Sequence, residues 1–451
     1  MAPKVVWARI NGGTNSANQV GAELGLARTA DGVLHVIWNR GSSRSNGQTT
    51  IFQTRISRTG SVLGTSTVAS GWSGLAGGNV LVVMPDKTLR LFVSGGYAPG
   101  VAGGINMLTA PPSGQVFTRD PSAVWGGDFA AASPFIAATV SHGQIVTAWD
   151  GSYNVGLAAA NKYPSVHSFM SVPQLATDAK TGAVVFSGIT NAGKGGVYVQ
   201  QVLPRPGPGR LLASGMNTDW GASGATARIG AGGVYVLTAD GQAKVLALTR
   251  YNGGTVVVAR GAYYYYANVF AAPGGRLWVA WYPGTGTDLF ATRSNGAVSR
   301  FEAVQTLALP ATSQLDDDAI YGNGAAGPLD LFARQSIGPV SGFLFTHVLA
   351  IMHVTSAVVP IISKTVVPVT SKNGNVIGHK LKVKVVGHEL KVFVSDAGDP
   401  VPGATVTVGK RHATTKIGGA ATFDYPGSPT GPVAVTVTAF GYHPVVTSAA
   451  L

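Results

Sequence analysis

An alternation of apolar runs and turn-forming residues extends through most of this chain. An apolar strand is followed by a tight turn of Gly, Asp or Asn, and then by a second strand rich in β-branched and aromatic residues. Such a unit predicts a β-hairpin, because a short turn between two runs of this kind joins antiparallel strands. The unit recurs in seven copies that start at Leu24, Val80, Phe135, Gln174, Ala225, Val269 and, more weakly, Ala319.

Several copies also contain a second hairpin. The pairs Thr54-Arg55, Thr249-Arg250 and Thr292-Arg293 end a strand and precede a Gly turn. Two hairpins supply the four strands of a propeller blade, and the turn glycines recur about every 40–55 residues, the period expected for such blades. We therefore predict an all-β fold with a propeller of about seven blades. Six or eight blades remain open, because the copies are unequal.

The segment Val5–Ile10 is predicted to supply an outer strand of the last blade. Trp7 stands in the same relation to the first inner strand as Trp72, Trp125 and Trp220 do to later ones. Pairing the two ends of the repeat region within one blade would close the ring and remove its exposed strand edges.

A change in composition separates these repeats from a second module. Lysine replaces arginine as the main basic residue after Ile362, and all eight tryptophans lie before residue 282. The later part contains the alternation Lys380-Leu-Lys-Val-Lys-Val-Val, which is typical of a strand with one polar face. We expect a propeller at residues 1–356, a linker at 357–378 and a small β-sandwich at 379–451.

The junction between the modules is unusually apolar. No Asp, Glu, Lys or Arg occurs between Arg334 and Lys364, so a transmembrane helix has to be considered. The stretch nevertheless contains His347, His353 and Pro360 and is rich in β-branched residues, which favours strands. We expect no membrane span.

Composition narrows the choice of fold and chemistry. The chain has only three Glu against 62 Gly, which excludes coiled coils and helical bundles, and it has no Cys, which excludes disulfides and thiolate metal sites. The abundant Gly and Ala are expected on inner strands that crowd near a propeller axis. The net charge of +13 is spread along the chain without a basic run, so we expect no nucleic-acid partner.

The repeat phrase LA-x-x-x-x-G-x-x-x-V-x-W resembles that of sialidase-like (BNR-type) β-propellers, over roughly residues 20–350. The resemblance implies a propeller, and in true sialidases a catalytic set of an Arg cluster, a Tyr nucleophile with a Glu base, and an Asp acid. The Asp-box motif of those enzymes, Ser-x-Asp-x-Gly-x-x-Trp, is not intact in any repeat.

The second module is similar to the transthyretin-like, or carboxypeptidase-regulatory-like, β-sandwich family. The matching phrases are G-x-PVPGATVTV, TT-x-x-G-x-A-x-F and VTVTA-x-GY-x-P, within residues 375–448. This resemblance implies a spacer, an adhesive module or an interaction surface, and no catalysis.

Candidate catalytic groups are few. The propeller has only Glu23 and Glu302, whereas most glycosidases need two carboxylates facing each other across the bond. Asp316–Asp318 is the only carboxylate cluster, and we expect it to be a solvated loop. We expect no metal and no cofactor. Four arginines could approach the axis, but we expect them to pair with backbone carbonyls or scattered Asp: Arg28, Arg228, Arg250 and Arg293.

Aromatic residues at the crossovers between blades are the main candidates for binding. Repeated aromatic rings with polar neighbours can stack on sugar rings in pockets between blades, although the same rings can also serve only as packing. The run Tyr263–Tyr266 lies at an equivalent crossover, and the loop Tyr282–Asp288 joins it on the same face. The residues predicted to bind ligand are Trp72, Trp125, Trp220, Tyr153 and Arg40.

These features favour a non-enzymatic recognition or structural protein. The two-module build resembles phage tail or adhesin proteins, and the first residues lack the apolar segment of a secretory signal. We expect a virion or extracellular-surface location, a cell-surface glycan or polysaccharide as ligand, and structural proteins of a larger assembly bound through the sandwich. The alternatives are a glycoside hydrolase of sialidase-like architecture and a pure protein–protein scaffold.

Overall fold

The structure is a computed structural model of the chain, and it divides into two units, Met1–Val348 and Leu349–Leu451, which are described separately. The structure describes residues 5–11, 24–40, 49–72, 78–96, 103–125, 135–156, 164–166, 171–190, 196–214, 223–240, 243–262, 264–284, 286–311, 314–337, 340–370, 376–426 and 431–450.

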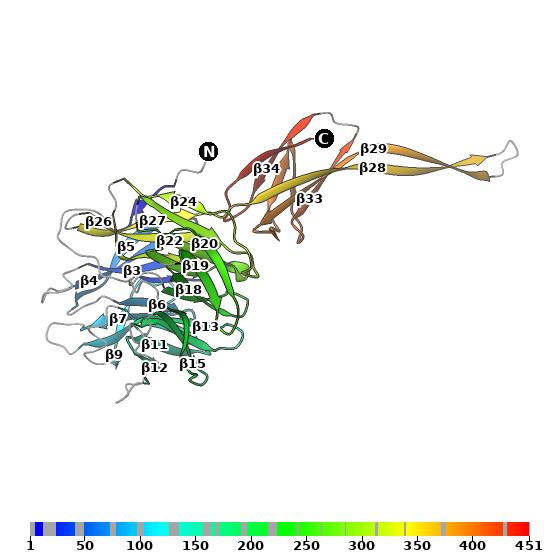
Figure 1. Cartoon of the computed structure of the whole chain (residues 1–451). Helices are drawn as coiled ribbons and strands as arrows, with labels where there is room; N and C mark the ends of the chain where they lie inside the picture. The colour runs from blue at the N-terminus through cyan, green and yellow to red at the C-terminus, as the bar shows by residue number, and fades with distance from the viewer. Residues whose placement is uncertain are drawn as a thin grey trace. The chain divides into compact units, whose positions relative to one another are not determined.

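In the first unit the described residues form seven antiparallel sheets, which follow one another along the chain (Figure 1). The first four sheets contain β2 (Gly25–Arg28), β3 (Leu34–Arg40), β4 (Thr49–Ile56) and β5 (Val62–Trp72); β6 (Asn79–Val83), β7 (Leu89–Gly95), β8 (Gly104–Ala110) and β9 (Thr118–Trp125); β10 (Ala137–Ser141), β11 (Gln144–Trp149) and β12 (Ser152–Val155); and β13 (Ser171–Thr177), β14 (Val184–Thr190), β15 (Gly196–Leu203) and β16 (Arg210–Ser214). The last three contain β17 (Ser223–Ala227), β18 (Val234–Asp240), β19 (Val245–Arg250) and β20 (Thr255–Arg260); β21 (Tyr266–Ala271), β22 (Leu277–Tyr282), β23 (Asp288–Arg293) and β24 (Gln305–Ala308); and β25 (Gln314–Asn323), β26 (Leu329–Ile337), β27 (Val340–Val348) and β1 (Ala8–Arg9).

The first strands of the seven sheets form a closed ring. They contact one another in chain order from β2 to β25, and β25 contacts β2 again. The short strand β1 pairs with β27, with Ala8 opposite Phe345, so the last sheet contains strands from both ends of the unit. In a closed ring each blade has a neighbour on both sides, so no sheet is left uncovered at an end where other molecules could aggregate. The predicted all-β fold with a seven-bladed propeller is confirmed.

Glycine on the inner strands allows neighbouring blades to approach closely. A Cβ atom on Gly224 of β17 would lie 2.4 Å from Asn268 Oδ1 and 3.2 Å from the backbone nitrogen of Val269, both on β21. A Cβ atom on Gly25 of β2 would lie 3.3 Å from the backbone nitrogen of Leu81 on β6. The high Gly content thus follows from contacts between adjacent inner strands, as expected from composition.

Apolar side chains fill the spaces between adjacent sheets. One buried cluster joins Ile51 and Trp72 of the first blade to Leu81, Leu91 and other residues of the second. Because each sheet is covered on both faces by its neighbours, its strands are apolar on both faces, and Leu34, Val36 and Ile37 of β3 are all fully buried.

The second unit is a β-sandwich of two four-stranded sheets. One sheet contains β28 (His353–Thr370), β29 (Val376–Asp396), β30 (Asp399–Pro400) and β33 (Ala420–Pro426). The other contains β32 (Arg411–Thr414), β31 (Thr405–Val408), β34 (Pro432–Thr438) and β35 (Val445–Ala450). Leu390 and Val392 of the first sheet share one buried cluster with Val406 and Val435 of the second.

The predicted linker at residues 357–378 is wrong. Strand β28 covers residues 353–370 and pairs with β29 along its whole length, from His353 opposite Ser395 to Thr370 opposite Val376. Pro360 and Pro368 are tolerated in β28 because it is an edge strand of its sheet. Proline has no backbone N–H, so it costs no hydrogen bond where an edge strand faces away from its neighbour. The division between units also falls at Val348 and Leu349 instead of residue 356.

The apolar junction is built from strands. Strands β27 and β28 occupy it, as its β-branched composition predicts. Within the described ranges no helix has the length and hydropathy needed to cross a membrane.

Candidate functional site

The two ends of the propeller ring present different parts of each blade. At one end, which we call the crossover end, the chain passes from one blade to the next and from the second strand to the third. At the other, the turn end, lie the turns between first and second strands and between third and fourth strands. This division follows from four antiparallel strands per blade.

A tyrosine cluster lies at the crossover end of the sixth blade. Tyr266 begins β21 and is directly opposite Tyr282, the last residue of β22. Their rings are stacked with centroids 6.2 Å apart, and Tyr265 meets the ring of Tyr266 edge-on at 4.6 Å. Tyr265 and Tyr282 are partly exposed, whereas Tyr264 is buried and lies edge-on to Trp281 at 6.3 Å. We call Tyr265, Tyr266 and Tyr282 the tyrosine cluster.

The loop after β22 fits closely around this cluster. The backbone nitrogen of Tyr265 donates a hydrogen bond to the carbonyl of Tyr282 at 3.0 Å, which fixes the crossover to the end of β22. Gly284 has a φ of 82°, and a Cβ atom there would lie 3.0 Å from the Cβ of Tyr265. Glycine is required at this position because its backbone conformation is left-handed and the space beside it is filled.

The chemistry of the cluster is that of neutral phenols. Burial raises the pKa of the Tyr282 hydroxyl, so the group stays protonated at neutral pH and can donate a hydrogen bond. It donates to the carbonyl of Gly286 at 3.2 Å in an exposed position. Asp288, which begins β23 after the same loop, is partly exposed and adds a hydrogen-bond acceptor. Partly open rings bordered by polar groups can hold a flat ligand with an apolar face and hydroxyl groups.

Two residues predicted to bind ligand belong to the core. Trp72 is only 2% exposed, packs between the first and second blades, and donates through Nε1 to the carbonyl of Ser94 at 3.1 Å. Tyr153 is 3% exposed and packs against Phe186 of the next blade, and burial raises its pKa. Neither ring offers an open face, so the expectation that these two residues stack on a ligand is wrong and the packing interpretation holds.

The remaining predicted residues do not join one site in the described part of the chain. Arg40 is exposed at the end of β3, with its guanidinium carbon 5.2 Å from the centroid of the Phe52 ring. Trp125 is the last residue of β9. Trp220 lies outside the described residues. The tyrosine cluster was marked in the sequence only by the run of four tyrosines, which pointed to a crossover without distinguishing exposed rings from buried ones.

A polar cluster joins the first and last blades at the turn end. Asp330 of β26 is fully buried, and its carboxylate pairs with the guanidinium of Arg28 at the end of β2. Its other oxygen lies 2.8 Å from Nδ1 of His347, near the end of β27. Burial lowers the pKa of Arg28, and the charge of Asp330 opposes this effect. We call Arg28, Asp330 and His347 the seam cluster.

Arginine and aspartate side chains also form hydrogen bonds between other pairs of adjacent blades. Arg228 of the fifth blade donates through Nε to the carbonyl of Gly275 in the sixth at 2.9 Å, and Arg293 of the sixth donates to Gly327 of the seventh at 3.3 Å. Asp178 of the fourth blade accepts from the backbone nitrogen of Gly233 in the fifth at 2.7 Å. The expectation that these arginines pair with carbonyls and scattered Asp is confirmed for Arg28, Arg228 and Arg293.

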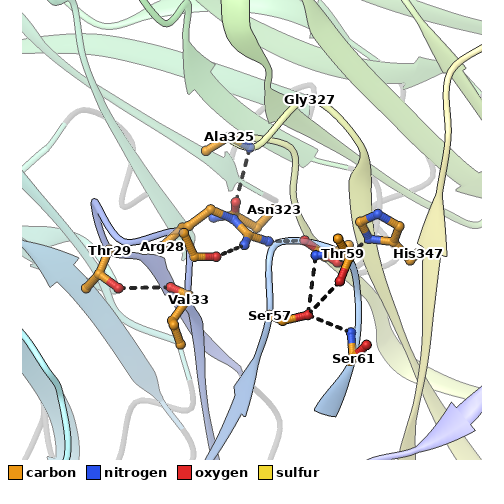
Figure 2. Close-up of polar contacts among 12 residues, drawn as sticks. Arg28, Thr29, Val33, Ser57, Thr59, Ser61, Asn323, Ala325, Gly327 and His347 are labelled. Carbon is orange, nitrogen blue, oxygen red and sulfur yellow. Dashed lines mark hydrogen bonds and ion pairs between the residues drawn. The ribbon is translucent and has the colours of Figure 1, made fainter. Parts of the chain in front are cut away.

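The seam cluster lacks the arrangement of a catalytic His–Asp pair. Ser57 and Thr59 lie in the turn beside His347, but their hydroxyls bond to each other at 3.1 Å, and neither of these two hydroxyls is hydrogen-bonded to His347 (Figure 2). A nucleophile would have to lie within hydrogen-bond reach of the base. Glu302 is buried and accepts from Gln305 at 3.2 Å, and Glu23 lies outside the described residues.

Two further expectations concern carboxylates and metals. Asp316–Asp318, expected in a loop, lies within β25, where the pairing register shifts between Leu315 and Ile320. Within the described ranges, no group of three or more His, Asp or Glu residues is placed to hold a metal ion.

The chain is similar to several solved structures at low sequence identity. No family model and no curated protein sequence matches the chain. Among solved structures, the BP39L lectin from Burkholderia pseudomallei is 14% identical, with a TM-score of 0.50 over 71% of this chain and 99% of the lectin. An Aleuria aurantia lectin described as a six-bladed β-propeller is 10% identical, with a TM-score of 0.37 over 72% of this chain and 94% of that one. An α-L-arabinanase from Penicillium chrysogenum complexed with arabinobiose is 12% identical, with a TM-score of 0.40 over 68% of this chain and 98% of the enzyme.

The class of protein defined by the fold is thus a β-propeller joined to a β-sandwich within one chain. The likeness to the BP39L lectin extends to the fold alone, and the seven sheets of this ring come from its own strand pairing.

Proposed function

We propose that this protein is a non-enzymatic glycan-binding protein and that the tyrosine cluster is one of its sugar-binding sites. The observation that carries the proposal is the pair of partly exposed rings, Tyr265 and Tyr282, held in fixed geometry at the crossover end of the sixth blade. The fold it shares with the BP39L lectin supports the same class of ligand.

The cluster suits a sugar for two physical reasons. One face of a pyranose ring carries mainly C–H groups, which pack on an aromatic ring, while its edge carries hydroxyls that need hydrogen-bond partners. The Tyr282 hydroxyl donates its proton to the carbonyl of Gly286, so its oxygen can accept a hydrogen bond from a sugar hydroxyl. The partly exposed carboxylate of Asp288, at the end of the same loop, is a second acceptor. Because Tyr265 is fixed to the carbonyl of Tyr282, little freedom is lost when a ligand binds.

Binding without hydrolysis is supported by the position of Glu302, the one glutamate of the propeller that the structure describes. Glycoside hydrolysis generally needs two carboxyl groups about 5–10 Å apart across the bond. Glu302 lies at the turn end, following the third strand of its blade, whereas the tyrosine cluster is at the crossover end of the same blade. A glycoside hydrolase remains the alternative that the experiment below also tests.

The test is glycan binding by the full chain and by Tyr265→Ala and Tyr282→Ala variants. A glycan array identifies a ligand, and titration calorimetry then measures its affinity. Each substitution should weaken binding by up to about tenfold, because a stacked ring contributes about 0.5–1.5 kcal/mol. The matched control is Tyr251→Ala, a partly exposed tyrosine after β19 at the turn end, which should leave the affinity unchanged.

Three results would overturn the proposal. The first is a blank array, and the second is equal loss of affinity in the Tyr251→Ala control. The third is release of reducing sugar from the bound glycan, which would replace a binding protein with a glycoside hydrolase.

We also propose that the protein acts at a virion or extracellular surface, with the sandwich attached to structural proteins of a larger assembly. The separation of the chain into a propeller that carries the tyrosine cluster and a second, compact sandwich unit supports this division of roles. Neighbouring genes that encode capsid or tail components would support it, and neighbours that encode only metabolic enzymes would count against it.

A further inference from the structure

The outer part of the β28–β29 hairpin is a two-stranded ribbon. Strand β33 pairs with β29 only from Gly387 to Phe393, and β30 pairs only with Ser395 and Asp396. Residues 362–370 and 376–385 therefore pair only with each other within the described part of the second unit. Figure 1 shows these strands extending beyond the other strands of the sandwich. We call this part of the hairpin the ribbon.

The register separates the ribbon into two unlike faces. Lys380, Lys382 and Lys384 occupy alternate positions of β29 and are opposite Val367, Thr365 and Ser363 of β28. Residues directly opposite one another in an antiparallel pair share a face, so these six form one face. The other face pairs Leu381 with Val366, Val383 with Lys364 and Val385 with Ile362.

The charge of this region is entirely basic. No Asp or Glu occurs between Arg334 and Glu389, while the same stretch contains Lys364, Lys372 and the three alternate lysines of β29. Several like charges without acidic neighbours create a positive potential that attracts anionic polymers and is screened by salt.

We propose that the lysine face of the ribbon binds an acidic polysaccharide. Alternate residues of a strand are about 7 Å apart, so the three lysines form a straight row that can meet successive carboxylates or sulfates of an extended chain. Ser363 and Thr365 are opposite Lys384 and Lys382 in the register.

The composition of the ribbon favours a polysaccharide over a nucleic acid. Proteins that bind single-stranded nucleic acids combine basic residues with aromatic rings on which bases stack, and Arg is their preferred reader of bases and phosphates. Residues 353–392 contain no Phe, Trp, Tyr or Arg. This inference is independent of the tyrosine cluster, which belongs to the other unit.

The test compares two variants of the full chain that lose equal charge. The ribbon variant carries Lys380→Gln, Lys382→Gln and Lys384→Gln. The control variant carries Lys244→Gln, Lys410→Gln and Lys416→Gln, three exposed lysines outside the ribbon. Binding to polygalacturonate, with neutral dextran as the uncharged probe, is measured by calorimetry at two salt concentrations.

The ribbon variant should bind polygalacturonate at least about tenfold more weakly than the parent protein, with a smaller salt dependence. The control variant should stay within about twofold. Binding of the glycan identified for the tyrosine cluster should be unchanged in the ribbon variant, which separates this proposal from the proposed function.

The proposal is overturned by any of four outcomes. These are no binding of polygalacturonate by the parent protein, equal weakening in both variants, equal binding of neutral dextran, and tighter binding of single-stranded DNA than of polygalacturonate. The last result would assign the ribbon to a nucleic acid.

Discussion

Arg28 and Asp330, from the first and last blades of the propeller, form an ion pair with side chains only 5% and 0% exposed. The pair joins strands that are far apart in sequence and lies at the seam where the ring closes. Because both charges are removed from water, each depends on the other, and on His347 and Gly32, for its hydrogen bonds.

Asp330→Asn should destabilise the propeller by about 3 kcal/mol, since it leaves the buried Arg28 charge without its counterion. Intrinsic tryptophan fluorescence during denaturant unfolding measures this unit alone, because all eight tryptophans precede residue 282. Asp86→Asn, in an exposed turn of the second blade, should leave the unfolding midpoint unchanged. Equal midpoints for parent and Asp330→Asn would contradict a role for the pair in closure.

His35 should make the propeller less stable in mild acid. It is 1% exposed, and burial, opposed by Asp31, lowers its pKa from 6.5 to about 4. Gln53 donates to its Nδ1 at 2.7 Å, and its Nε2 lies 3.2 Å from the Thr29 hydroxyl, an arrangement that suits the neutral ring.

The unfolded chain therefore takes up a proton at His35 near pH 6.5, whereas the folded propeller does so only near pH 4. Stability is lost as the pH falls through this window, by up to about 3 kcal/mol for this group. Between pH 7 and pH 4, the unfolding free energy of the parent protein should fall more steeply with decreasing pH than that of His35→Gln. Parallel curves would show that another group controls the acid response.

Gly224→Ala should destabilise the propeller by about 1–3 kcal/mol, because the added methyl group would overlap Asn268 on the neighbouring inner strand. Asn268 is not free to move away, since it donates to the carbonyl of Ile320 at 3.1 Å. Gly254→Ala is the control in the same blade, where a Cβ atom meets no atom within 4 Å. Its unfolding midpoint should equal or slightly exceed that of the parent, and a matching loss in both variants would rule out the close approach as the cause.

Trp72→Phe should separate packing from ligand binding. The substitution removes the hydrogen bond to Ser94 and leaves a cavity between two blades, so we expect a loss of about 1–3 kcal/mol in unfolding free energy with unchanged glycan affinity. Trp7→Phe makes the same chemical change at a less buried ring, whose Nε1 donates to the carbonyl of Ala308 at 2.8 Å, and should have a smaller effect. A Trp72→Phe protein that folds but no longer binds the glycan would contradict this prediction and would place Trp72 in the binding site.

Sequence periodicity predicted the propeller well because each blade repeats a similar local sequence pattern. The Thr-Arg pairs illustrate this, since Thr54, Thr249 and Thr292 are all buried and use their hydroxyls to bond the following turn or strand. A local signal of this kind does not depend on distant partners, so it can be identified before the fold is known.

The site and the module boundary were harder to predict because they depend on contacts between distant residues. Trp72 and Tyr265 both occur near crossovers, and only the packing of the neighbouring blade decides which ring is covered. The segment expected to be a linker, residues 357–378, is instead largely an edge strand, because it pairs with β29.

The pairing of β1 with β27 also has a consequence for biosynthesis. The partner of Ala8 is Phe345, so at about 5–20 residues per second a ribosome needs on the order of tens of seconds to supply it. During that interval the earlier blades have no closed ring to join, and the exposed face of each new blade is covered only by the next. A chaperone that shields apolar sheets during synthesis would therefore raise the yield of this protein more than one that acts after release.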